Sequence, residues 1–135
     1  MPFVLDTNIV GELLREERGV VAHTRKQLRR KQALLMCPVV LYELERGLLA
    51  KPGATKKRAL LAEWLDVLEY RELDRSVWME AARLWADSRR TGRPHSDDDL
   101  LIAAFAKVHG AILVTRNRRD FEGLGVRLEG WDQSS

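Results

Sequence analysis

The chain has 135 residues, 45% of them hydrophobic and 32% charged, a size and balance typical of one soluble, compact domain. Its longest apolar run, residues 100–106, is much shorter than the roughly 20 residues that span a bilayer, and an acidic residue at position 6 interrupts the start too early for a secretory signal. The single cysteine cannot form an internal disulfide and no Cys/His set has zinc spacing, so we expect a cytoplasmic protein without a membrane segment or structural zinc.

The first half of the chain predicts two short strands, each followed by helices. Residues 3–5 indicate a buried strand, and Asp6 is suited to cap a helix that runs to about residue 17. A second helix is expected over residues 20–31 and a second buried strand over residues 34–37. Pro38 is favoured in the first turn of the next helix, which ends at residues 52–53. Residues 58–68 form another amphipathic segment.

The second half continues the alternation. Residues 70–73 predict a brief strand, and Asp74 caps a long helix that ends at about residue 90, before Gly92-Arg93-Pro94. Ser96 has the sequence context of a helix cap, and the apolar helix that follows ends at Gly110. Residues 111–114 predict a buried strand, residues 115–121 a polar turn or short helix, and residues 126–128 a last strand.

Strands that alternate with helices favour an α/β fold with a mainly parallel sheet covered by helices on both faces. No repeat, linker or low-complexity segment divides the chain. We therefore expect one domain over residues 1–135, with its core at about residues 3–131. The tryptophans at positions 64, 78, 85 and 131 are expected in the core or at a subunit interface rather than stacked on bases.

The net charge of +3 conceals a separation of charge along the chain. Lysines and arginines gather between residues 15 and 31, between residues 51 and 58, and between residues 116 and 119. The densest acidic point is residues 97–99. A basic surface around a concentrated acidic spot could attract a polyanion and hold a cation that acts on it. Solvated helix faces are the simpler explanation for any single basic run.

Four carboxylates are expected to meet at one edge of the sheet, because ligands bind outside the carboxyl ends of parallel strands. Asp6 follows the first strand, Glu43 lies in the helix after the second, and Asp120 lies in the turn after the strand that ends at residue 114. Asp99 lies in the first turn of the apolar helix, whose beginning faces the same edge. Like charges placed together raise one another's pKa or need a cation between them. One or two Mg²⁺ ions satisfy such a group and can activate water for phosphodiester hydrolysis.

Each of these residues also has a purely structural explanation. Asp6 could only cap its helix, Glu43 could pair with Arg46 on a helix surface, and Asp99 could be a favourable charge at a helix start. Asp120 could pair with Arg116 or Arg118. Four further residues are common in caps and turns: Thr7, Asn8, Thr115 and Asn117.

Four motifs, taken together, resemble the PIN-domain ribonucleases and, more narrowly, the VapC toxins of bacterial and archaeal toxin–antitoxin pairs. They occur in order over about residues 3–131: Val4-Leu5-Asp6-Thr7-Asn8, Glu43-Leu44 followed by Gly47, Asp99-Leu100-Leu101-Ile102-Ala103-Ala104, and Leu113-Val114-Thr115-Arg116-Asn117 with Asp120-Phe121. Each motif is weak by itself, whereas the ordered set is specific.

The resemblance implies a three-layer α/β/α sandwich, RNA cleavage that depends on Mg²⁺ or Mn²⁺, a homodimer, and a cognate VapB-like antitoxin. By position, Asp6 and Asp99 match the central metal ligands, and Glu43 matches the acidic residue that completes the first metal site or orients water. Asp97 and Asp98 are then only neighbours of Asp99, whose register is set by the Ile-Ala-Ala that follows. The fourth position is filled by either Asp120 or Asn117. Thr7, Asn8, Thr115 and Asn117 would support the ligands or the attacking water.

Two other functions remain as alternatives. A non-catalytic RNA-binding or partner-binding module would explain the basic runs but not the convergent acids. A receiver-like phosphoacceptor domain has a similar length and a parallel sheet, but it needs paired acids after the first strand and an aspartate after a middle one. Asp6 stands alone, and no aspartate lies between residues 37 and 57.

Overall fold

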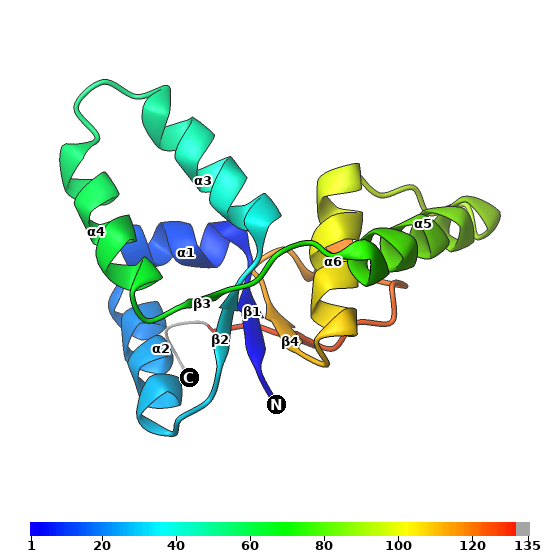
Figure 1. Ribbon diagram of the computed structural model, residues 1–135, viewed down its shortest axis with the longest axis horizontal. Helices are drawn as coiled ribbons and strands as arrows, with labels where there is room; N and C mark the ends of the chain where they lie inside the picture. Colours follow the sequence, from blue (N-terminus) through cyan, green and yellow to red (C-terminus); the bar gives the residue numbers. More distant parts are fainter. Residues whose placement is uncertain (132–135) are drawn as a thin grey trace.

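A computed structural model of the chain describes residues 1–131; the last four residues of the predicted domain lie outside the described part. The five strands form one parallel sheet in the order β3-β2-β1-β4-β5 (Figure 1). The strands are β1 Phe3–Leu5, β2 Leu34–Met36, β3 Glu69–Tyr70, β4 Ile112–Val114 and β5 Leu128–Glu129. The predicted three-layer α/β/α fold with a parallel sheet is confirmed.

Helices cover the sheet on both faces, with α1, α2 and α4 gathered on one side and α5 and α6 on the other (Figure 1). Their bounds are α1 Thr7–Leu14, α2 Arg18–Arg29, α3 Pro38–Leu49, α4 Thr55–Leu65, α5 Arg75–Arg90 and α6 Asp97–Val108, with the short 3₁₀ helix η1 at Arg118–Phe121. In the part of the chain that is described, no helix combines the length and apolar character needed to cross a membrane.

Local chemistry explains where the helices begin. The Asp6 carboxylate accepts a hydrogen bond from the Thr7 backbone N–H, and the Asp74 carboxylate accepts one from the Val77 N–H. Ser96 caps α6, its hydroxyl oxygen accepting from the Asp99 N–H at 3.2 Å. These caps satisfy amides that have no partner within the helix. The predicted caps at these three positions are confirmed.

Several boundaries differ from the sequence-based expectation. The helix expected over residues 20–31 covers residues 18–29, the segment expected over 58–68 is helical over 55–65, and the last strand, expected over 126–128, covers 128–129. The first helix ends at Leu14, before the predicted residue 17, because Glu16 takes a left-handed conformation with φ of 57° that a helix cannot continue through. The third strand covers residues 69–70 instead of 70–73. Its last backbone bond to β2 runs from the Arg71 N–H to the Met36 carbonyl at 3.4 Å, after which the chain leaves the sheet.

The core lies between the central strands and the helices that cover them. Every residue of β1, β2 and β4 is buried, which matches their continuous apolar sequences. The predicted apolar helix α6 is buried along residues 102–106. Trp131 is fully buried and packs edge-on to Phe3, whereas Trp78 and Trp85 are 53% and 45% exposed. Cys37 is buried as predicted, and burial raises the pKa of its thiol to about 11.

Candidate active site at the carboxyl edge of the sheet

The topology brings the predicted acidic residues to one edge. The central strand β1 is flanked by β2 and β4, and all three run in parallel, so the residues that follow them emerge at the same edge. Asp6 follows β1 directly and Glu43 lies in the second turn of α3. Asp99 lies in the first turn of α6, and Asp120 lies in η1.

Hydrogen bonds to both carboxylate oxygens fix the side chain of Asp6. It is only 7% exposed, and its Oδ1 accepts from the Thr7 N–H at 2.8 Å. Its Oδ2 accepts from the Thr115 hydroxyl at 2.7 Å, a contact that joins the ends of β1 and β4. Burial raises the pKa of Asp6 against the opposing effect of the Thr115 and Thr7 hydrogen bonds, and the charge of Asp120 adds to the rise. Asp6 therefore caps α1 and also contributes a constrained carboxylate to the edge.

Thr7, the residue next to Asp6, holds the side chain of Glu43 by a hydrogen bond. The Thr7 hydroxyl donates to Glu43 Oε1 at 2.6 Å, whereas Arg46 approaches Oε2 only to 3.9 Å. The expected helical ion pair is present but is the longer of the two contacts. Burial raises the pKa of Glu43 against the Thr7 hydrogen bond, and the carboxyl groups of Asp98 and Asp6 add to the rise.

Asp99 interacts electrostatically with carboxylates of two other elements. Burial raises its pKa, the Ser96 hydroxyl opposes the rise, and the charges of Asp120 and Asp6 add to it. Asp120 forms no ion pair within residues 1–131, so the alternative that it pairs with Arg116 or Arg118 is wrong. Arg116 instead donates to both oxygens of Glu12, at 2.6 and 2.7 Å.

The polar residues around the acids form a connected set. Thr115 donates its hydroxyl proton to Asp6 and accepts from the Asn117 N–H at 3.0 Å. Asn8 Oδ1 accepts from the Arg116 N–H at 3.4 Å, which ties the start of α1 to the segment after β4. Thr7 and Thr115 thus contact the carboxylates of Glu43 and Asp6 directly, whereas Asn8 and Asn117 contact the segment that follows β4.

Sequence reasoning set Asp98 aside as a neighbour of Asp99, but its carboxyl group lies near enough to Glu43 to raise the pKa of that residue. The signal was present in the sequence: the first turn of α6 faces the edge at which Glu43 was expected, so more than one of its three aspartates could reach the rim. Asp97 takes a different direction and lines an apolar groove with Trp78 and Trp85.

Comparison with known proteins decides the family. The profile of the PIN domain matches residues 3–126. The chain belongs to the PIN-domain family. It is 33% identical over 133 residues to the VapC ribonuclease Y4jK of Sinorhizobium fredii, which covers 93% of this chain and 94% of that protein. It is 28% identical to the tRNA(fMet)-specific endonuclease VapC of Shigella flexneri, over 97% of this chain and 98% of that protein.

Solved structures of VapC-containing complexes share the fold. The VapBC2 complex of Rickettsia felis, bound to a promoter DNA fragment, matches with a TM-score of 0.90 at 24% identity, over 98% of this chain and 100% of that chain. The DNA-bound VapBC of Salmonella typhimurium matches with a TM-score of 0.85 at 25% identity, over 98% of this chain and 99% of that chain. The resemblance to VapC-like PIN domains is thereby confirmed.

The donor chemistry of this PIN domain suits a hard divalent cation. The carboxylates of Asp6, Glu43 and Asp99 each have a pKa raised by burial and then by neighbouring carboxylates, a conflict that a cation relieves. Within residues 1–131, no three His, Cys, Asp or Glu side chains converge closely enough to hold an ion together. Mg²⁺ commonly takes one or two carboxylates and keeps several waters. The carboxylates at this edge therefore fit a Mg²⁺ ion even though no three of them converge on one point.

Proposed function

We propose that this PIN domain is a Mg²⁺- or Mn²⁺-dependent endoribonuclease and the toxin of a toxin–antitoxin pair. The observation that carries the proposal is the placement of Asp6, Glu43 and Asp99, three carboxylates from separate elements, at the carboxyl edge of the sheet, where the charge of Asp6 adds to the rise in the pKa of both Glu43 and Asp99. Similarity to VapC ribonucleases over nearly the whole chain supports the same function. We expect one catalytic domain that spans about residues 3–131.

We assign metal binding to this group of carboxylates, Asp6, Glu43, Asp99 and Asp120, of which one or two would contact an ion directly while waters complete its coordination. When bound there, a divalent ion supplies Lewis acidity to the phosphate and lowers the pKa of a bound water. Asp120 and Asn117 both follow β4, so the fourth position stays open between them. The four carboxylates concentrate negative charge at this edge. A phosphodiester is also an anion, so it would bind there only with a cation between them.

The chain's own hydroxyl groups fix the orientation of two of these carboxylates, Asp6 and Glu43. Thr115 holds Oδ2 of Asp6 and Thr7 holds Oε1 of Glu43, which leaves one oxygen of Glu43 toward the more distant Arg46. Each hydroxyl has one proton to donate, so its donor is committed to the carboxylate. Held in this way, the carboxylates need little reorganisation when substrate arrives, which is the general condition for electrostatic catalysis.

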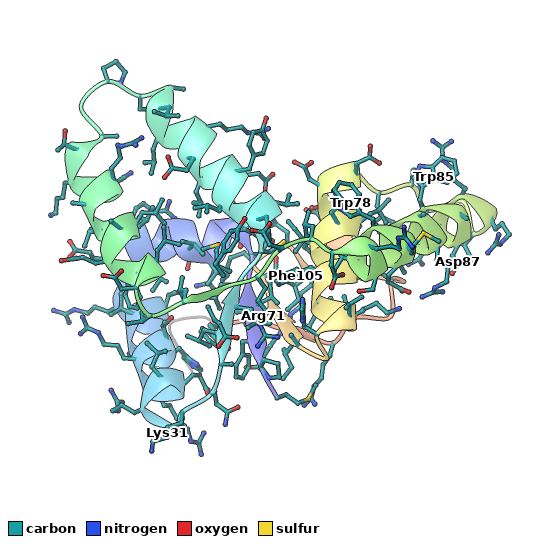
Figure 2. All side chains as sticks on the ribbon, viewed as in Figure 1. Lys31, Arg71, Trp78, Trp85, Asp87 and Phe105 are labelled. Atoms are coloured by element: carbon teal, nitrogen blue, oxygen red, sulfur yellow. The ribbon has the colours of Figure 1, made fainter. Side chains whose placement is uncertain are left out.

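We infer two protein partners. The structures that share this fold contain VapB antitoxins, so we expect a VapB-like antitoxin to bind this chain. We also propose a homodimer through α5 and α6, where Trp78, Trp85 and Leu101 line an apolar groove of about 450 Å³. Figure 2 places both exposed tryptophans on this part of the molecule. Large exposed apolar patches mark interaction surfaces.

The experiment that tests the proposal measures cleavage of RNA by the purified chain after metal is removed with EDTA. We expect no cleavage in EDTA and recovery of cleavage when millimolar Mg²⁺ or Mn²⁺ is restored. Cleavage that continues at full rate in EDTA would contradict a metal-dependent mechanism. Light scattering on the same sample measures its mass, and a monomer at micromolar concentration would contradict the dimer.

A further inference from the structure

A groove leads away from the carboxylate edge between α1, α3 and α4. These helices lie next to one another in Figure 1, and α1 contacts both α3 and α4. The narrow section of the groove, of about 160 Å³, has Glu43 in its wall. The wide section, of about 470 Å³, lies beyond the end of α3. Four residues line both sections, so the two form one continuous groove: Leu14, Arg15, Lys51 and Lys57.

The wide section of the groove is basic. Its walls contain four cationic side chains, those of Arg15, Lys51, Lys56 and Lys57, and one carboxylate, that of Glu16. Within residues 1–131, neither Lys51 nor Lys57 has a carboxylate within 4.0 Å. Lys56 contacts Glu16 at 3.4 Å, and Arg15 is paired with Glu17. Both of these cations are more than half exposed, and such surface ion pairs contribute little to stability. The wide section thus offers positive charge to an anionic ligand.

Two glycines keep the narrow section open. Gly11 of α1 and Gly47 of α3 both line it. A glycine within a helix makes that helix less stable than an alanine would. A Cβ atom at Gly47 would meet no atom within 4 Å, and one at Gly11 would meet only Nη1 of Arg15, at 3.5 Å. Packing within the chain therefore does not require glycine at either position, and the space beside them is free for a molecule that enters the groove.

The position of the groove relative to the carboxylates suits a strand of RNA. Glu43 lies near the start of α3 and Lys51 lies beyond its end, about 12 Å further along the helix axis at about 1.5 Å per residue. An RNA that is cut at the carboxylate edge must continue away from it, and every nucleotide carries a negatively charged phosphate. The cations of the wide section would therefore meet phosphates that lie a few nucleotides from the cut.

We propose that this groove holds the RNA strand on one side of the cut, with Lys51 and Lys57 contacting its backbone phosphates. This inference rests on the proposed ribonuclease function. Phosphate contacts carry no sequence information, so the groove adds affinity and fixes the path of the strand without selecting a base. An acidic protein segment would also match the charge of the wide section. RNA is favoured because the groove begins at Glu43, one of the carboxylates assigned to cutting.

The test measures binding of a fluorescent oligouridylate of about 12 nucleotides, a length within the range that single-strand sites hold. Binding is followed by fluorescence anisotropy in EDTA, which prevents metal-dependent cleavage, at several NaCl concentrations. Each phosphate contact to a single strand contributes about 0.7 to the slope of log Kd against log NaCl concentration. Lys51→Gln/Lys57→Gln should therefore lower this slope by about 1.4 and raise Kd about tenfold.

Lys31→Gln/Arg127→Gln is the matched control, because it removes the same charge from another part of the surface. Both side chains are exposed, and they precede β2 and β5, so they lie toward the amino edge of the parallel sheet. Figure 2 shows Lys31 at the far end of α2, away from α3. This variant should keep the wild-type slope and Kd. Circular dichroism verifies that both double variants are folded.

Gly47→Gln tests the narrow section without a change of charge. The new side chain would occupy the groove, and glutamine favours a helix more than glycine does, so Tm should not fall. The KM for RNA cleavage in Mg²⁺ should rise several-fold. Lys51→Gln/Lys57→Gln should also raise KM, with kcat unchanged, because these lysines bind substrate away from the scissile phosphate.

Two results would overturn the inference: a wild-type Kd and salt slope for Lys51→Gln/Lys57→Gln, or an equal loss of binding in the control variant. A wild-type KM for Gly47→Gln would overturn the path through the narrow section. If Lys51→Gln/Lys57→Gln kept RNA binding and lost binding of a polyglutamate peptide, the groove would instead belong to an acidic protein segment. None of these results affects the proposed function, because the wild type would still cleave RNA in Mg²⁺. A chain that binds oligouridylate through Lys51 and Lys57 but cleaves no RNA would refute the proposed function alone.

Discussion

Replacing Thr115 with valine should destabilise the folded chain and loosen the Asp6 carboxylate. Thr115 is 1% exposed, its hydroxyl donates to Asp6 at 2.7 Å, and its oxygen accepts from the Asn117 N–H at 3.0 Å. Valine keeps the shape of the side chain and removes both contacts. A hydrogen bond to a charged group is worth about 1.5–3 kcal/mol and a neutral one about 0.5–1.5 kcal/mol, so we expect a loss of about 2–4 kcal/mol.

Urea denaturation in EDTA at pH 7 measures this loss as a lower free energy of unfolding, and a thermal scan should show Tm lower by roughly 6–15 °C. Thr115→Ser retains the hydroxyl and is the matched control, with an expected loss of less than about 1.5 kcal/mol. If Thr115→Val were as stable as the wild type, the hydroxyl would not be holding the carboxylate, and the account of how Asp6 is oriented would be refuted.

Two further predictions concern charge. The pKa of Asp99 is raised above 3.8 by burial, and the charges of Asp120 and Asp6 add to the rise. The contribution of Asp99 to stability is therefore complete below about pH 3.8 and is lost as the pH rises through the folded-state pKa. Asp99→Asn should therefore raise the Tm of the metal-free chain at pH 7 and make no difference below about pH 3.8; an equal shift at both pH values would contradict this reasoning. Arg116→Met should cost about 2–4 kcal/mol, because it leaves the Glu12 carboxylate, only 9% exposed, without its bidentate partner. Adding Glu12→Gln should restore part of that loss in urea denaturation, and a double variant less stable than the single one would argue against the pairing.

Most of the architecture could be predicted because it follows from local sequence patterns. The apolar runs at residues 3–5, 34–37 and 111–114 indicate buried strands in a chain that alternates strands and helices, and all of these residues are buried. The parallel order then places whatever follows those strands at one edge, so Asp6 and Glu43 could be expected there. The left-handed residue Glu16 carries no comparable signal, since glycine and asparagine are the residues that usually mark such a turn.

Contacts between distant residues could not be predicted in the same way. Thr115 and Asp6 are 109 positions apart, and only the register of β1 beside β4 brings the hydroxyl to the carboxylate. From the sequence alone, Arg116 could pair with any of several carboxylates. The packing of α1 against the end of β4 brings Glu12 to it. The exposure of Trp78 likewise depends on which face of α5 packs on α6, since an aromatic residue fits either a core or an interface.

The central claim is that carboxylates from separate elements form one metal-dependent centre for RNA cleavage. The most direct measurement compares the rate of RNA cleavage in Mg²⁺ by the wild type, Asp6→Asn and Asp99→Asn, with Asp66→Asn as a control for an exposed aspartate at the end of α4. We expect the first two substitutions to abolish cleavage in chains that still fold, and Asp66→Asn to retain the wild-type rate. Undiminished cleavage by both Asp6→Asn and Asp99→Asn would contradict the claim.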